Sequence, residues 1–441
     1  MKKPSGFLLI CIVLLITIYI VMGVMTSYKK DILGRLIEII RKYSLDDYSV
    51  SYSVADFQKL SKDLNDLKIY IKESSKGKEI LPFIEEVLNR VTDRIDLQEY
   101  ENEGTESFTA FKTIKDQALN SNQIMSINSI KSRKEKIRHT EKLREKIFEL
   151  MGYSSVKKSP LNTRAIKKVD CGEYITEEII FDSEPGISVP GYLLIPKNIS
   201  FPAPAIIALH EHAGEHYFGA DRVIGIGGSD PNQLYAKELC QRGYITLAID
   251  ARSFGRRSGI NEFLIDYLGR WIGKNLFGMI IWDDIRSVDY LLTRKEVDPN
   301  RIGCIGHSLG GARATYLAAL DERIKVVVIS GYVTSYKSVI KNTNLLQPPS
   351  TWLPGVWKYA DCKDALSLIA PRPLLIVHGK RDDIFSIEGM LDAYKSLKKI
   401  YAIFEAEDRL KSIVFDGRHG FPEEIHEEAY QWFDKWLKKG K

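Results

Sequence analysis

The sequence is poor in cysteine, and its five cysteines follow no pattern. Cys11, Cys171, Cys240, Cys304 and Cys362 lie far apart and form no C-x-x-C pair. This spacing excludes a disulfide framework and a zinc knuckle. The apolar run around Cys304 predicts a buried, inert thiol at that position.

The sequence also lacks a strong excess of either charge. Its net charge is +5 over 441 residues, and no block of arginine and lysine interleaved with aromatic residues occurs. Such a block is the usual sequence feature of a nucleic-acid-binding face, so we exclude nucleic acid as a partner. With 44% hydrophobic and 27% charged residues, the composition is that of an ordinary globular protein. The length predicts two or three structural units.

One long stretch without charge lies near the N-terminus. Residues 7–25 (FLLICIVLLITIYIVMGVM) are apolar or weakly polar, and lysines flank them on both sides. As a helix they would span about 28 Å, close to the ~30 Å of a bilayer core. A cleaved signal has a shorter apolar core and a small-residue cleavage site. We therefore expect a single-pass transmembrane anchor over residues 1–27, with a signal segment as the alternative. Because the N-terminal tail is short and easily retained inside, we expect the rest of the chain to lie outside the cytoplasm.

A helical pattern occupies residues 28–160. Apolar residues recur at steps of three and four over 57–71 and over 84–95, and the break at 74–79 predicts an antiparallel helical pair. A third helix is predicted over 131–151. We interpret the apolar stripes as packing faces; the alternative is that residues 28–150 bind a protein partner or a membrane surface.

From residue 161 to residue 441, short apolar runs alternate with helical patterns. The predicted strands are 173–183, 187–196, 205–209, 244–250, 302–306, 325–330, 373–379 and 410–417, and the predicted helices are 231–242, 282–294, 310–320, 386–399 and 423–438. This alternation predicts an α/β fold with a mostly parallel sheet covered by helices on both faces. The stretch 335–363 interrupts the alternation, and we expect it to form a cap.

A G-x-S-x-G motif, residues 306–310, connects the strand 302–306 to the helix 310–320. In such a turn, side chains at Gly306 and Gly310 would collide with the backbone, and Ser308 is left strained with its hydroxyl exposed. The N-terminus of the following helix adds free N–H groups and a dipole that favour a developing oxyanion. We predict Ser308 to be a nucleophile.

A general base and an orienting acid are needed to activate a serine. Asp382 follows the strand 373–379, and His419 follows the strand 410–417. The order serine, aspartate, histidine, each on a loop after its own strand, is the order of α/β-hydrolases. We predict His419 as the base and Asp382 as the acid, with Asp383 as the competing acid.

Four motifs of this chain carry a family resemblance. HEHAG, GHSLGG, APRPLLIVHGKRDDIF and GRHGF resemble the α/β-hydrolases around dienelactone hydrolases, acetyl xylan esterases and prolyl-oligopeptidase-like enzymes. The acetyl xylan esterase-like branch is the most similar. The resemblance covers about residues 165–438 and implies an α/β-hydrolase fold with Ser308, Asp382 and His419 as its catalytic triad.

The stretch HEHAGEH contains three of the eight histidines and suggests a metal site. An H-E-x-x-H zinc motif would need a histidine four residues after His210, where Gly214 stands, and a glutamate after His212, where Ala213 stands. His210 and His212 could chelate an ion from a strand, but they would need a third ligand. Gly214 also interrupts any helix that would align His216 with them. We predict no metal and no cofactor.

The resemblance implies a different role for this loop, which follows the third core strand. Its backbone N–H at His212, with Glu211 as the alternative, and the N–H of Leu309 are expected to form the oxyanion hole. The family more often has glycine or glutamine at the position of Glu211. A carboxylate there would repel the oxyanion unless it turns away or pairs, with Arg252 and Arg256 as candidate partners.

Two further groups of residues have open roles. Asp283 and Asp284 are expected to cap the N-terminus of the helix 282–294. Trp352, Trp357 and Tyr359 either line an acyl or sugar pocket or form the core of the cap.

These features together predict a membrane-anchored serine hydrolase that cleaves ester bonds through an acyl-enzyme. The resemblance implies a small-acyl ester as substrate, such as an acetylated carbohydrate. A prolyl-oligopeptidase-like exopeptidase is the enzymatic alternative, although the chain lacks the long repeated β sequence of a propeller. A non-catalytic protein that keeps the fold and binds a partner is the alternative of a different class.

Overall fold

The computed structural model describes residues 106–154, 156–213, 216–226, 230–341 and 348–438, together with Lys62 and Asp66. The chain divides into two compact units, Met1–Ala118 and Leu119–Lys441, and helix α5 (Glu106–Asn120) includes residues of both. The predicted membrane segment 7–25 lies outside the described residues, as does the predicted helical pair apart from Lys62 and Asp66. Among the helices that the structure describes, none has the length and apolar character needed to cross a bilayer.

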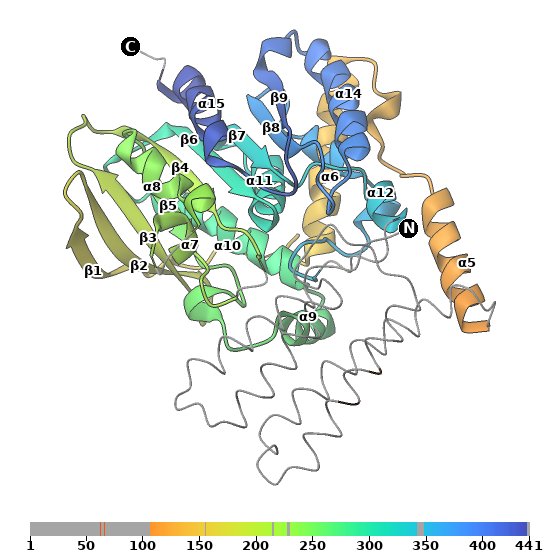
Figure 1. Ribbon diagram of the computed structural model, residues 1–441, viewed down its shortest axis with the longest axis horizontal. Helices are drawn as coiled ribbons and strands as arrows, with labels where there is room; N and C mark the ends of the chain where they lie inside the picture. Colours follow the sequence, from red (N-terminus) through yellow and green to blue (C-terminus); the bar gives the residue numbers. More distant parts are fainter. Residues whose placement is uncertain are drawn as a thin grey trace. The chain divides into compact units, whose positions relative to one another are not determined.

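A single large sheet forms the centre of the second unit (Figure 1). Its strands are β1 (Arg164–Asp170), β2 (Tyr174–Glu184), β3 (Ile187–Pro196), β4 (Ala203–Leu209), β5 (Ile245–Ile249), β6 (Val297–His307), β7 (Ile324–Ser330), β8 (Leu374–Gly379) and β9 (Leu410–Phe415). Their order across the sheet is β1-β2-β3-β5-β4-β6-β7-β8-β9. The pairs β1–β2, β2–β3 and β3–β5 are antiparallel, and all pairs from β5 to β9 are parallel. The predicted α/β fold with a mostly parallel sheet is confirmed.

Alternate residues of β4 show that the sheet is buried on both faces. Ala205, Ile207 and Leu209 belong to one buried apolar cluster, whereas Ile206 and Ala208 belong to another. The first cluster includes residues of α6 (Arg133–Met151), α10 (Leu276–Leu291), α11 (Leu309–Leu320) and α14 (Ile387–Ile403). The second includes residues of α7 (Asp221–Ile224), α8 (Tyr235–Gln241) and α15 (Glu423–Phe433). Burial on both faces explains why these strands read as continuous apolar runs.

Helix α6 belongs to the same compact unit as the sheet. Ser132 caps its N-terminus, and Gly152 ends it with a left-handed φ of 81°. Leu143, Ile147 and Met151 on one face of the helix are fully buried in the first apolar cluster. The compact unit therefore begins before residue 161, the predicted start of the hydrolase domain.

Helix α10 begins earlier than expected. The Asn275 side chain accepts a hydrogen bond from the N–H of Gly278 at 2.8 Å and caps the helix there. Asp283 and Asp284 consequently lie in the middle of α10, fully buried. The prediction that they cap the helix was wrong.

The segment 335–363 packs against the first apolar cluster. It contains α12 (Tyr336–Lys341), a 3₁₀ turn (Val356–Lys358) and the start of α13 (Cys362–Leu366). Leu353 and Val356 are buried in that cluster. The ring of Trp352 lies 5.1 Å from that of Tyr336 and 5.8 Å from that of Tyr332. The described part of this segment therefore contributes aromatic side chains to the core beside the carboxyl ends of the strands.

Candidate active site

Ser308 lies in the turn between β6 and α11. Its backbone has φ 56° and ψ −117°, a conformation that residues with a side chain rarely adopt. A Cβ on Gly306 would lie 2.2 Å from the carbonyl oxygen of Gly310, and a Cβ on Gly310 would lie 1.9 Å from the carbonyl oxygen of Leu209. Only glycine fits at these two positions, so the turn has the tightness and strain that the motif predicts.

Leu309 is the first residue of α11 and is fully buried. N–H groups in the first turn of a helix have no carbonyl partner within that helix. The N-terminus of α11 therefore presents donors and a favourable dipole directly beside Ser308. This is the arrangement required of an oxyanion donor at Leu309.

His419 is paired with Asp382. The Nδ1 atom of His419 lies 2.9 Å from Oδ2 of Asp382, whose side chain is fully buried. Oδ1 of Asp382 accepts hydrogen bonds from the backbone N–H groups of Ile384 and Phe385, each at 2.9 Å. The carboxylate is therefore fixed in place, and Nδ1 of the imidazole is the nitrogen that it holds.

Asp383, the competing acid, points elsewhere. Its Oδ2 atom accepts a hydrogen bond from the Arg418 guanidinium at 2.8 Å, and about half of its side chain is exposed. The structure thus brings Asp382 to the histidine and Asp383 to a surface arginine.

Ser330, at the end of β7, links the Ser308 turn to the His419 loop. Its carbonyl oxygen accepts the N–H of Ser308 at 3.0 Å. Its hydroxyl donates to the carbonyl oxygen of Gly420 at 3.1 Å and lies 3.2 Å from Nδ1 of His307. The rings of His307 and His419 are 4.7 Å apart. These contacts hold His419 against the strand end from which Ser308 projects.

The surrounding charges shift the pKa values of His419 and Asp382. Burial by itself lowers the pKa of His419, but the hydrogen bond to Asp382, its charge and that of Glu211 outweigh burial and raise this pKa above its ordinary value. Burial likewise raises the pKa of Asp382, but its bond to His419 and that residue's charge hold it below the usual range. The pair therefore combines an ionised carboxylate with an imidazole of increased proton affinity.

His210 fixes the loop that follows β4. Its Nδ1 atom lies 2.8 Å from the carbonyl oxygen of Glu211, and its Nε2 atom accepts the N–H of Ala251 at 3.1 Å. Complete burial lowers the pKa of His210 well below its ordinary value, so the ring is neutral, with Nδ1 as donor and Nε2 as acceptor. This histidine is a structural link between two loops at the carboxyl edge of the sheet.

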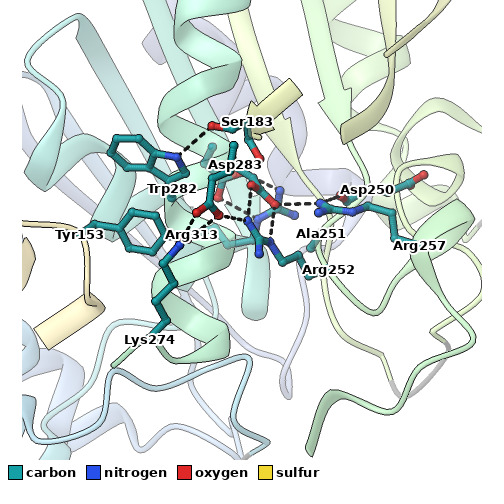
Figure 2. Close-up of polar contacts among 12 residues, drawn as sticks. Tyr153, Ser183, Asp250, Ala251, Arg252, Arg257, Lys274, Trp282, Asp283 and Arg313 are labelled. Atoms are coloured by element: carbon teal, nitrogen blue, oxygen red, sulfur yellow. Dashed lines mark hydrogen bonds and ion pairs between the residues drawn. The ribbon is translucent and has the colours of Figure 1, made fainter. Parts of the chain in front are cut away.

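A buried network of charges supports the second of these loops. Arg252, which follows Ala251, donates to both carboxylate oxygens of Asp283 at 2.9 Å and to Glu184 at 2.7 Å. Arg257 donates to the same Asp283 at 2.8 Å. Figure 2 shows Arg252 and Arg257 converging on this aspartate from one loop. Asp283 therefore supports this loop, whereas Asp284 bonds to Arg313 of α11.

Glu211 pairs with Arg222. An oxygen of its carboxylate, Oε1, lies 3.4 Å from Nη1 of Arg222, and the other lies 3.7 Å from Nε2 of His307. The two candidate partners are occupied elsewhere, Arg252 as described and Arg256 by Asp250 at 2.8 Å. The expectation that Arg252 or Arg256 pairs with Glu211 was wrong, because the loop turns this carboxylate towards α7.

The three histidines of the loop do not meet at one point. Whereas His210 turns to the neighbouring loop, Nε2 of His212 lies 3.1 Å from Oε1 of Glu262, and Nε2 of His216 lies 3.7 Å from the same oxygen. Sequence reasoning missed Glu262, which is 50 residues from His212. The one available signal was Asn261, which precedes the amphipathic stretch EFLIDYLGRW and caps α9 (Glu262–Trp271).

Comparison with known families agrees with the fold and the order of these motifs. The family model described as the Abhydrolase family matches residues 105–411. The chain therefore belongs to this family and is a hydrolase of the α/β-hydrolase class.

Individual relatives are named as hydrolases or esterases as well. The Bacillus subtilis (strain 168) protein named "Putative hydrolase YtaP" is 32% identical over 295 residues, which cover 67% of this chain and 98% of that protein. A crystal structure from Bacteroides fragilis NCTC 9343, described as a putative acetyl xylan esterase, has a TM-score of 0.60 at 20% identity, covering 74% of this chain and 89% of that one. A glucuronoyl esterase from Solibacter usitatus has a TM-score of 0.56 at 18% identity, covering 72% and 97%. At these identities the two structural matches establish the shared fold.

Proposed function

We propose that this protein is a serine esterase that cleaves small-acyl esters, with acetylated or otherwise esterified carbohydrates as its substrate class. The observation that carries the proposal is the 2.9 Å contact between His419 and the buried Asp382, held beside the strained turn of Ser308 by Ser330. The names of two structural neighbours, an acetyl xylan esterase and a glucuronoyl esterase, support the carbohydrate ester class.

In the proposed mechanism, Ser308 Oγ attacks the ester carbonyl while Nε2 of His419 takes its proton. Nδ1–H of the imidazole stays bonded to Asp382, which fixes the tautomer and stabilises the imidazolium. The N–H groups of Leu309 and His212 bind the oxyanion, and each such donor contributes ~3–4 kcal/mol in comparable sites. The proton then passes to the departing alcohol, and water activated by His419 releases the acyl group. No cofactor takes part in these steps.

Aromatic side chains beside His419 support a small apolar acyl group. The Phe385 ring lies 5.7 Å from the His419 ring and 6.1 Å from that of Trp352. Tyr332 packs against Phe385 at 5.6 Å. Tyr332 and Phe385 are buried in the core, and we propose that the half-buried Trp352 packed on them meets an acyl group of limited length beside the base.

Labelling with a fluorophosphonate probe tests the nucleophile. We expect the wild type to form one covalent adduct and Ser308→Ala to form none. Ser396→Ala, which removes an exposed serine hydroxyl on α14, is the matched control and is expected to label as the wild type does. Absence of labelling in the wild type, or equal labelling of Ser308→Ala, would refute the proposal.

A substrate panel tests the reaction class. It consists of p-nitrophenyl esters of increasing acyl length, acetylated xylo-oligosaccharides and peptide p-nitroanilides. We expect kcat/KM to be highest for acetyl or similarly short esters and to be negligible for the anilides. Preferential cleavage of the anilides would instead support the exopeptidase alternative.

We also propose that residues 7–25 anchor the protein in a membrane, with the hydrolase unit outside the cytoplasm. The support is the uncharged length of this segment, which suits a bilayer core. Carbonate-washed membranes of expressing cells should retain the full chain and release a chain lacking residues 1–27. Release of both forms would contradict the anchor.

A further inference from the structure

Three side chains from two separate segments converge beside the active site. His212 and His216 come from the loop after β4, and Glu262 is the first residue of α9. One ligand-type atom from each, two imidazole nitrogens and a carboxylate oxygen, lie within 4.8 Å of one another. Two histidines and a glutamate are a common protein ligand set for a zinc ion.

The distances suit coordination by one ion. Zinc bonds of 2.0–2.2 Å in tetrahedral geometry separate neighbouring ligand atoms by about 3.3–3.6 Å. Oε1 of Glu262 lies 3.1 Å from Nε2 of His212 and 3.7 Å from Nε2 of His216. The carboxylate oxygen therefore lies near the coordination spacing from both imidazoles, and the whole set, within 4.8 Å, would close onto one ion with side-chain adjustments of roughly 1 Å.

Further contacts orient two of the three groups in the way that metal ligands are oriented. Nδ1 of His216 lies 3.1 Å from the carbonyl oxygen of Ser253, so this nitrogen carries the proton and Nε2 keeps its lone pair. Oε2 of Glu262 accepts the Ser350 hydroxyl at 2.6 Å, whereas Oε1 faces Nε2 of His212 at 3.1 Å, a contact that a bound ion would replace. Each of these two groups thus offers one atom to a common point while its other polar atom is held from behind.

The charge around Glu262 also favours a cation. Its side chain is only 5% exposed, and in the described part of the chain its recorded ion pairs are with His212 and His216. A buried carboxylate is stabilised by hydrogen bonds and by a positive charge beside it. Phe254 confines the cluster, because its ring stacks on His216 at 4.5 Å and meets His212 edge-on at 5.1 Å.

We propose that His212, His216 and Glu262 bind a divalent transition-metal ion of the zinc type, with a fourth position open. The ion would link His212 and His216, in the loop after β4, to Glu262 at the N-terminus of α9. The loop leaves β4 at Leu209, the residue whose carbonyl oxygen a Cβ on Gly310 would strike, so this link lies close to the turn of Ser308. Its role is to fix the oxyanion loop, and the hydrolytic steps do not pass through the ion.

Metal binding is measured on the full chain, prepared without a polyhistidine tag and stripped with a chelator. We expect calorimetric titration with ZnCl₂ to give one equivalent of binding and CoCl₂ to give the visible absorption of four-coordinate Co²⁺. Zinc is also expected to raise the Tm of the stripped protein. Absence of stoichiometric binding of both ions would overturn the proposal.

Matched variants locate the site. Glu262→Gln and His216→Asn should each weaken zinc binding at least 100-fold, and Ser350→Ala should weaken it 10–100-fold, as loss of an outer-shell contact does. His212 is left unchanged because its backbone belongs to the oxyanion loop. Two substitutions at separate positions keep the test valid if one variant folds poorly, which circular dichroism detects.

Glu238→Gln is the control, because Glu238 is also a carboxylate bonded to a histidine, 2.8 Å from Nδ1 of His426. It should bind zinc as the wild type does. Equal affinity of Glu262→Gln and wild type, or an equal loss in Glu238→Gln, would overturn the assignment. Fluorophosphonate labelling of the same samples reports separately on Ser308, so failure of the metal site is distinguishable from failure of the esterase.

Discussion

Arg222 and Glu211 form a largely buried ion pair, with Nη1 of the arginine 3.4 Å from Oε1 of the glutamate and side chains 10% and 12% exposed. The other carboxylate oxygen lies 3.7 Å from Nε2 of His307. The carboxylate of Glu211, in the loop after β4 that we propose to bind the oxyanion, is thus turned towards cationic and polar neighbours. Its negative charge still acts on His419, whose pKa it helps to raise.

The first prediction concerns that charge. In the proposed mechanism hydrolysis needs neutral His419, so activity should be lost as the pH falls through the pKa of this residue, and a raised pKa should move this loss to higher pH. Glu211→Gln removes one cause of the increase, so the acid limb of kcat/KM should move to lower pH while the plateau is retained. Asp392→Asn, an exposed carboxylate bonded to Lys363, should leave the limb in place. An unchanged limb in Glu211→Gln would mean that this side chain is uncharged in the free enzyme.

The second prediction separates the two neighbouring aspartates. Asp382→Asn leaves the shape of the site but favours the wrong imidazole tautomer, and kcat should fall ~10⁴-fold. Asp383→Asn breaks an exposed contact with Arg418, which contributes at most about 1 kcal/mol to stability, and kcat should change less than threefold. Steady-state kinetics on one p-nitrophenyl ester measures both. The reverse ranking would make Asp383 the acid.

The third prediction concerns Ser330. Ser330→Ala removes the hydroxyl that holds Gly420 and contacts His307, and a lost hydrogen bond of this type costs about 1 kcal/mol. We expect kcat to fall roughly fivefold, with KM unchanged, because His419 is held less firmly. Ser287→Ala removes a similar buried bond within α10, to the carbonyl oxygen of Asp284, and should lower stability without affecting kcat. Equal kinetic effects of the two substitutions would assign Ser330 a purely structural role.

Apolar periodicity predicts the core of this fold because β4 to β8 are buried on both faces. The edge strand β1 has no apolar run, since all seven residues of RAIKKVD are exposed, and its strand character comes only from pairing with β2. Helix α9 was missed for a related reason. Its Phe263, Leu268 and Trp271 are exposed. The apolar residues of α9 therefore do not mark a face packed against the sheet.

The candidate site likewise contains some residues that the sequence predicts and some that it does not. Ser308, Asp382 and His419 could be found because each follows a strand, and the carboxyl ends of parallel strands meet at one edge. Glu262 and Arg222 carry no motif, and their contacts with the oxyanion loop depend on how two short helices pack after the sheet has formed. Sequence spacing contains no signal for such contacts, which explains both why Glu262 was missed and why the partner expected for Glu211 was wrong.

The fourth prediction concerns the buried pair of Asp284 on α10 and Arg313 on α11, which lies about one helical turn after Ser308. Both side chains are fully buried, and the guanidinium donates two hydrogen bonds to the carboxylate, at 2.7 and 3.0 Å. Removing one partner leaves an uncompensated buried charge, so Asp284→Leu or Arg313→Met should each lower the free energy of unfolding by about 3–5 kcal/mol.

Removing both charges is expected to behave differently. The double variant avoids the cost of desolvating two ions and should be markedly more stable than either single variant. Lys411→Met, which breaks an exposed pair with Glu428, is the control and should cost less than about 1 kcal/mol. Urea unfolding of the four variants and the wild type measures these differences. Additive losses in the double variant would mean that the two buried charges do not compensate each other and that the prediction is wrong.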